Sequence, residues 1–205
     1  HVYGITRRGF APSSVPPSGY LADSLADDVL AVLDELGVGR FRLMGHDWGA
    51  YTSLLIAATA PERVERMIPM SFPPPWDRRP DPRKLIGGAH VPFLAFTNDH
   101  VVPVLAEQIL KRGSSNSDTD VEVFVERFRP KERRSATVQV YRSFVLKDFR
   151  RGIPGGRPDV PLRFLGGATD PVTRYSGSLE EVRGAGHFLP EDKPDAVIGH
   201  ALSFL

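Results

Sequence analysis

The chain has 205 residues, of which 41% are hydrophobic and 25% charged, and its formal net charge is +1. This composition is typical of one α/β globular domain with room for a modest insertion, and a net charge near zero gives no reason to expect nucleic acid or an anionic membrane as a partner. The sequence contains no cysteine, which excludes disulfides and thiolate metal sites, and no apolar run is long enough to cross a bilayer. We therefore expect a cytoplasmic protein.

The first part of the chain alternates between strand and helix patterns. The predicted elements are, in order, a strand at 2–5, a helix over 20–36, a strand from Phe41, a helix over 50–60 and a strand at about 66–72. Apolar residues recur on one face of the first helix, and Pro61 ends the second. Alternation of this kind favours a parallel sheet with right-handed crossovers.

The alternation breaks at the prolines of 73–75, which exclude both a helix and a central strand. The predicted elements after them are helices over 102–110, 121–128 and 131–149, strands at 160–166 and 179–183, and a closing helix over 194–205. We interpret residues 73–159 as a helical lid, inserted between the two parts of a core domain, 1–72 and 160–205.

The strand from Phe41 runs directly into Gly45-His46-Asp47-Trp48-Gly49 and then into a helix. Small residues on either side of a central reactive residue permit a very tight strand-to-helix turn, which exposes that residue in a strained conformation. This is the pattern of a nucleophile elbow, whose usual central residue is serine. Here it is Asp47, so the candidate nucleophile is a carboxylate. Taken alone, the motif is equally compatible with an ordinary turn.

Two later residues also follow the ends of predicted strands. Asp170 comes after the strand at 160–166, and His187 comes after the strand at 179–183. Open α/β sheets place their sites at the carboxyl ends of the strands, and nucleophile, acid, histidine is the chain order of α/β-hydrolases. Asp170 could be a simple turn residue and His187 a solvated loop histidine, but their joint placement favours a catalytic triad.

The chain resembles the epoxide hydrolases and haloalkane dehalogenases of the α/β-hydrolase family in four segments. They are the elbow, Pro61-Glu62-Arg63-Val64 after it, Arg7-Arg8-Gly9-Phe10, and residues 184–191 around His187. The resemblance implies the α/β-hydrolase fold, which is a mostly parallel sheet flanked by helices with an inserted helical lid. It also implies that a carboxylate displaces at a saturated carbon of a small hydrophobic substrate and forms an alkyl ester. No cofactor or metal is expected.

Within that resemblance, Asp47 attacks, Asp170 orients His187, and His187 activates the water that hydrolyses the ester. The backbone N–H of Trp48 is the expected oxyanion donor. The side chains of Trp48, His46 and Phe93 are expected to line the oxyanion and substrate pocket. The alternative for Trp48 is that its side chain only packs in the core.

An opening epoxide leaves as an alkoxide and needs an acid. Tyr141-Arg142 resembles the second of the two lid tyrosines that supply it in family epoxide hydrolases, although plain lid packing would also explain Tyr141. We therefore expect an epoxide hydrolase.

Two other functions remain open on the sequence. A haloalkane dehalogenase needs N–H donors for a halide, and Trp76 and Asn98 are the residues that could join Trp48. A non-catalytic ligand-binding protein on the same scaffold is the second alternative. Three features depart from the family pattern: no His-Gly loop or further strand precedes Val2, no tyrosine stands at 90–110, and no helix follows Asp170. We expect the whole protein to be heavier than 22.6 kDa, and to be a monomer or homodimer.

Overall fold

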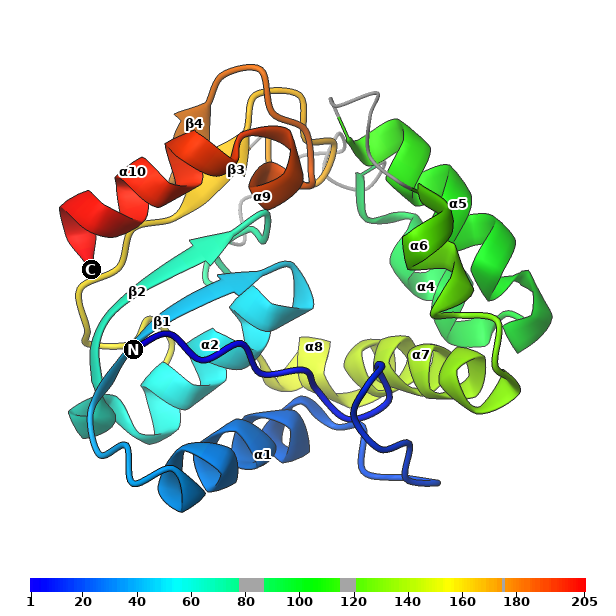
Figure 1. Cartoon of the computed structure of the whole chain (residues 1–205), viewed down its shortest axis with the longest axis horizontal. Coiled ribbons are helices and arrows are strands. Elements are labelled where there is room, and N and C mark those ends of the chain that lie inside the picture. The colour runs from blue at the N-terminus through cyan, green and yellow to red at the C-terminus, as the bar shows by residue number, and fades with distance from the viewer. Residues whose placement is uncertain (78–86, 115–120, 175) are drawn as a thin grey trace.

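The computed structural model describes residues 1–77, 87–114, 121–174 and 176–205. Its centre is a sheet in which β1, β2, β3 and β4 are neighbours in chain order (Figure 1). The strands are Phe41–His46, Val64–Met70, Leu165–Gly167 and Glu180–Val182. Every pairing between them is parallel, so the predicted α/β class with a parallel sheet is confirmed.

Helices cover both faces of the sheet. α1 (Ala22–Glu35) and α2 (Trp48–Thr59) lie on one face, and α10 (Pro194–Phe204) lies on the other, after the short α9 (Leu189–Asp192) (Figure 1). α2 is buried from Ala50 to Ala57, because it is enclosed between α1 and the first two strands. A helix that is apolar on all sides needs such an enclosed position.

The hydrophobic core is divided by the sheet. Met67 belongs to the cluster that includes α1 and α2, whereas the next residue, Ile68, belongs to the cluster that includes β3, β4 and α10. Both side chains are fully buried, which follows from the alternation of side chains along a strand whose two faces are both covered.

A second group of helices lies to one side of the sheet (Figure 1). Its members are α4 (His90–Phe96), the 3₁₀ turn Asp99–Val101, α5 (Val102–Gly113), α6 (Val121–Glu126), α7 (Lys131–Ser143), the π-helical turn Phe144–Asp148 and α8 (Phe149–Arg151). The sequence predicted one helix over 131–149. The structure has a continuous helical path there, which widens into the π-helical turn in its second half.

Two predicted strands differ from the structure. Residues 2–5 are not a strand, and Val2 is 99% exposed; no strand of the described residues pairs with them, and a strand needs a hydrogen-bonding neighbour. The strand predicted at 160–166 is regular only from Leu165, preceded by an isolated bridge between Leu162 and Met67. The Pro161 carbonyl accepts from the Met67 N–H at 3.0 Å in this bridge, but Pro161 has no N–H with which to extend the ladder toward residue 160. Among the described residues, no helix is long and apolar enough to span a membrane.

Candidate active site

Asp47 is the single residue between the end of β1 and the start of α2. Its φ of 51° lies in the left-handed region, and its ψ is −116°, which is a strained conformation for a residue with a side chain. The Asp47 N–H donates to the Met70 carbonyl at 2.9 Å, which fixes the turn against β2. A Cβ added to Gly45 would lie 2.4 Å from the Gly49 oxygen, so the close approach at this elbow requires glycine.

The structure brings Asp47, Asp170 and His187 together. Nδ1 of His187 lies 3.2 Å from Oδ1 of Asp170, and Nε2 lies 3.7 Å from Oδ1 of Asp47. The first distance is that of a hydrogen bond and the second is longer than one. Asp170 is fully buried, His187 is 8% exposed, and the Asp47 side chain is 32% exposed. The imidazole therefore stands between a buried carboxylate and a more accessible one.

Asp170 is held as a carboxylate by its neighbours. Its side chain accepts hydrogen bonds from the Val172 N–H at 2.8 Å and from the Thr173 hydroxyl at 2.6 Å. Burial would raise the pKa of Asp170, but its hydrogen bond with His187, the charge of His187 and the bonds from Thr173 and Val172 outweigh burial and lower it. A carboxylate in this state accepts from Nδ1–H and thereby leaves Nε2 of His187 facing Asp47.

The pKa of His187 is raised above its ordinary value. Burial disfavours the imidazolium and acts to lower the pKa, but the hydrogen bond to Asp170 and the negative charges of Asp47 and Asp170 outweigh burial. The Asp47 charge is thus one of the groups that favour a protonated His187.

The backbone of His187 is also fixed. Its carbonyl accepts from the Ser71 hydroxyl at 2.6 Å and from Nε2 of His46 at 2.7 Å. Its N–H donates to the Gly113 carbonyl at 2.6 Å, at the end of α5. Burial and the charge of His187 lower the pKa of His46, which leaves a neutral ring with the hydrogen on Nε2. The structure therefore places His46, predicted at the pocket, where it supports His187.

A second connection joins the same loop to α5. The carboxylate of Asp192 accepts from the Ser114 hydroxyl at 2.5 Å and from the Gly186 N–H at 2.6 Å. Ser114 directly follows α5, and Gly186 directly precedes His187. The C-terminal end of α5 is therefore hydrogen-bonded to the loop that carries His187.

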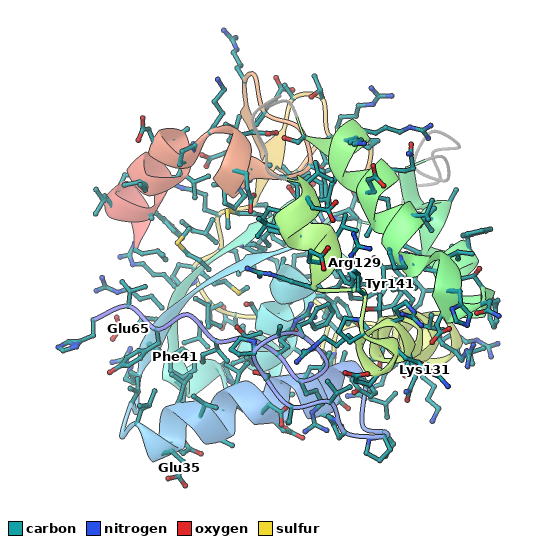
Figure 2. All side chains as sticks on the ribbon, turned by 45° about the vertical axis from the view of Figure 1, so that its right-hand side comes forward. Glu35, Phe41, Glu65, Arg129, Lys131 and Tyr141 are labelled. Atoms are coloured by element: carbon teal, nitrogen blue, oxygen red, sulfur yellow. The ribbon has the colours of Figure 1, made fainter. Side chains whose placement is uncertain are left out.

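Trp48 and Tyr141 form an aromatic pair beside Asp47. Their rings are 5.0 Å apart and nearly perpendicular, and Phe144 packs edge-on against Trp48 at 4.9 Å. Figure 2 labels Tyr141 and Lys131, which both come from α7; Lys131, at the start of that helix, is exposed, whereas Tyr141 packs against Trp48. Burial and the charge of Asp47 raise the pKa of Tyr141. A hydrogen bond with the Trp48 side chain and the charge of Arg7 act to lower it, but the effects that raise it are larger. Tyr141 therefore keeps its hydroxyl proton at neutral pH.

His90 is a site residue that the sequence analysis missed. Its ring lies 6.2 Å from that of Tyr141, and its Nδ1 lies 3.0 Å from the Gly87 carbonyl. Burial lowers the pKa of His90, the charge of Asp47 opposes this effect, and the charge of His187 adds to it. A carbonyl can only accept, so Nδ1 carries the hydrogen. The only signal in the sequence was a single histidine among apolar residues, which is weak.

The remaining sequence candidates lie outside this group. Phe93, on α4, is 55% exposed and is not part of the buried aromatic set; its place in the pocket stays a prediction. Trp76 packs edge-on against Phe164 at 5.7 Å in the core, and the Asn98 side chain accepts from the His100 N–H. The structure therefore does not bring either proposed halide donor to Trp48.

The chain is similar in sequence and in fold to known α/β hydrolases. A family model described as the alpha/beta hydrolase fold matches residues 1–85. Epoxide hydrolase 4 of Mus musculus is 37% identical over 76 residues, which are 36% of this chain and 21% of that protein. The soluble epoxide hydrolase of Corynebacterium sp. (strain C12) is 25% identical over 237 residues, 96% of this chain and 78% of that protein.

The solved structure of the epoxide hydrolase CorEH without ligand superimposes with a TM-score of 0.77 at 23% identity, covering 97% of this chain and 79% of the other. This likeness shows the α/β-hydrolase fold. The resemblance to the epoxide hydrolase group that the motifs indicated is confirmed. The match with the mouse protein spans only about a fifth of that protein's length.

Proposed function

We propose that this chain, which has the α/β-hydrolase fold and resembles the epoxide hydrolases in sequence and structure, opens an epoxide to a diol through an alkyl ester on Asp47. The observation that carries the proposal is the arrangement around that carboxylate. His187 faces it from one side at 3.7 Å, and the protonated Tyr141 lies beside it with Trp48. The substrate expected for this site is a small epoxide.

In the first step, one oxygen of Asp47 attacks an epoxide carbon, and the bond between that carbon and the ring oxygen breaks. The electron pair of that bond goes to the ring oxygen, which takes the hydroxyl proton of Tyr141. Asp47 suits this step because a carboxylate can displace in line at a saturated carbon. The raised pKa of Tyr141 keeps the proton available until the alkoxide forms.

In the second step, Nε2 of His187 removes a proton from water, and the hydroxide attacks the carbonyl carbon of the Asp47 ester. The oxyanion that forms lies at the start of α2, where the Trp48 N–H is free of an intrahelical partner. When the tetrahedral intermediate collapses, the bond between the acyl carbon and the alkyl oxygen breaks. The alkyl oxygen takes the proton held on His187 and the diol leaves, while the water oxygen remains in Asp47. The second proton of the water passes from the Asp47 carboxyl group to the Tyr141 phenolate, which restores both groups, and Asp170 stabilises the imidazolium while it holds its proton.

The geometry supports epoxide opening over release of a halide. Halide release needs N–H donors beside Trp48, and the residues offered for it, Trp76 and Asn98, are engaged elsewhere. An alkoxide needs a proton donor, and Tyr141 supplies one. We further propose that the helices α4 to α8 form the lid over this site, because Tyr141 comes from α7 and Gly113 of α5 binds the backbone of His187.

The test is a single turnover in ¹⁸O-labelled water with enzyme in excess over styrene oxide, followed by mass analysis of the diol and of the peptide containing Asp47. We expect an unlabelled diol and one heavy oxygen in Asp47. A labelled diol in the first turnover would mean direct attack by water and would contradict the proposal. Halide release from 1-bromobutane without epoxide opening would identify a dehalogenase, and binding without turnover a non-catalytic binding protein.

A further inference from the structure

Arg7 carries a buried positive group that the proposed reaction does not use. Its Nη1 is shielded from solvent and has no hydrogen-bond partner among the described residues. The guanidinium lies over the ring of Phe10, 5.1 Å from its centroid. A buried charged group without a partner is costly, so a group of this kind calls for a functional explanation.

The adjacent arginine shows what a satisfied guanidinium looks like in the same loop. Arg8 donates to both carboxylate oxygens of Asp28 and also to the Gly19 carbonyl. That side chain therefore fastens the loop to α1. Arg7 has no such ion pair within the described residues, although it stands one position away. The two arginines thus differ in role: Arg8 is structural, whereas Arg7 has an N–H donor at Nη1 without a hydrogen-bond partner among the described residues.

The surroundings of Arg7 are those of the active site. Burial lowers its pKa, and the negative charge of Asp47 and the Tyr141 hydroxyl act on it in the opposite sense. The charge of Arg7 in turn acts on Tyr141. No ion pair joins Arg7 to Asp47 among the described residues, so Nη1 of the guanidinium remains available as a donor.

We propose that Arg7 binds a carboxylate on the substrate, so that the preferred substrates of Asp47 are epoxides with an anionic group near the ring. This inference rests on the proposed function. Its chemical reason is charge: a carboxylate on the substrate is repelled by Asp47 and Asp170, and a buried cation on which the charge of Asp47 acts offsets that repulsion. Arginine suits this task because its planar fork matches a carboxylate and stays charged.

The test compares glycidate with glycidamide, which have similar size and the same epoxide but differ in charge. The full chain is measured as wild type, Arg7→Gln and Arg7→Lys, with thermal unfolding as a check of folding. Arg42→Gln is the matched control, because Arg42 is an exposed arginine whose partner is Glu65. The measured quantity is the ratio of kcat/KM for glycidate to that for glycidamide.

We expect this ratio to fall by about 10- to 100-fold in Arg7→Gln, the range for loss of a charge-assisted hydrogen bond, to be partly restored in Arg7→Lys, and to stay at the wild-type value in Arg42→Gln. A ratio that does not change in Arg7→Gln would overturn the inference, because a guanidinium that only balances the charge of Asp47 affects both substrates alike.

A binding measurement separates this inference from the proposed function. Lactate resembles glycidate but has no ring to open, and lactamide is its neutral counterpart. We expect lactate to quench tryptophan fluorescence at lower concentration than lactamide in the wild type, and this preference to vanish in Arg7→Gln. Preferential binding of lactate with no epoxide opening would refute the hydrolase proposal alone. Opening of glycidamide with no preference for lactate or glycidate would refute the Arg7 proposal alone.

Discussion

The charge of Asp47 should control the protonation of His187. Esterification removes that charge during the reaction, and Asp47→Asn removes it permanently with little change of shape. Because the negative charge of Asp47 is one of the causes that raise the pKa of His187, the pKa of His187 should fall in Asp47→Asn. The histidine would then be a neutral base in the ester intermediate, which is the form that the second step needs.

The magnitude follows from the distance between the two groups. Opposite unit charges 3.7 Å apart attract by about 1 kcal/mol at the dielectric constant of water and by about 4 kcal/mol at an effective value of 20. The Asp47 side chain is 32% exposed, which places the pair between these limits. Removal of the charge should therefore make protonation of His187 less favourable by at least about 1 kcal/mol.

The assay is an NMR titration of isotope-labelled imidazoles in wild type and in Asp47→Asn. The His187 signal is assigned by its loss in His187→Gln. Titration curves for His187 that coincide in the two proteins would refute the electrostatic coupling on which this reasoning depends.

Three further predictions test other parts of the site. Tyr141→Phe should slow ring opening by about 100-fold or more, measured as the rate of ester formation in stopped flow; an unchanged rate would exclude Tyr141 as the acid. Gly45→Ala should markedly lower the melting temperature, because its Cβ would lie 2.4 Å from the Gly49 oxygen, whereas Gly39→Ala has nothing within 4 Å and should not; equal melting temperatures would contradict this. The pKa of Asp170 is lowered in the folded chain, so its contribution to stability is complete above its ordinary pKa and is lost as the pH falls through the folded-state value. Urea unfolding of Asp170→Asn should consequently show a shallower loss of stability than the wild type as the pH falls below the ordinary pKa of an aspartate, and parallel curves would argue against it.

The shared position of Asp47, Asp170 and His187 could be predicted from the sequence because each of them follows the end of a strand. Parallel strands bring their carboxyl ends to one edge, so a local pattern of strand followed by Asp47, Asp170 or His187 was sufficient to predict a shared position. The glycines of the elbow reinforced this prediction, since their spacing reflects a backbone contact within a few residues.

The contacts that define the rest of the site join distant segments, and no local pattern encodes them. Tyr141 meets Trp48 and His90 only after the helical group packs against the core, and Arg7 reaches the site from a loop near the start of the chain. The same dependence on distant contacts explains why the strand predicted at residues 2–5 is wrong. A β-like composition there could not indicate whether a partner strand lies alongside.

The most direct test of the account is the mass of His187→Gln after exposure to styrene oxide. Without the base, the first step can proceed and the second cannot. The account predicts a covalent adduct equal to the mass of the epoxide, located on the peptide that contains Asp47 and missing from the double variant with Asp47→Asn. An unmodified His187→Gln protein, or an adduct on another residue, would contradict it.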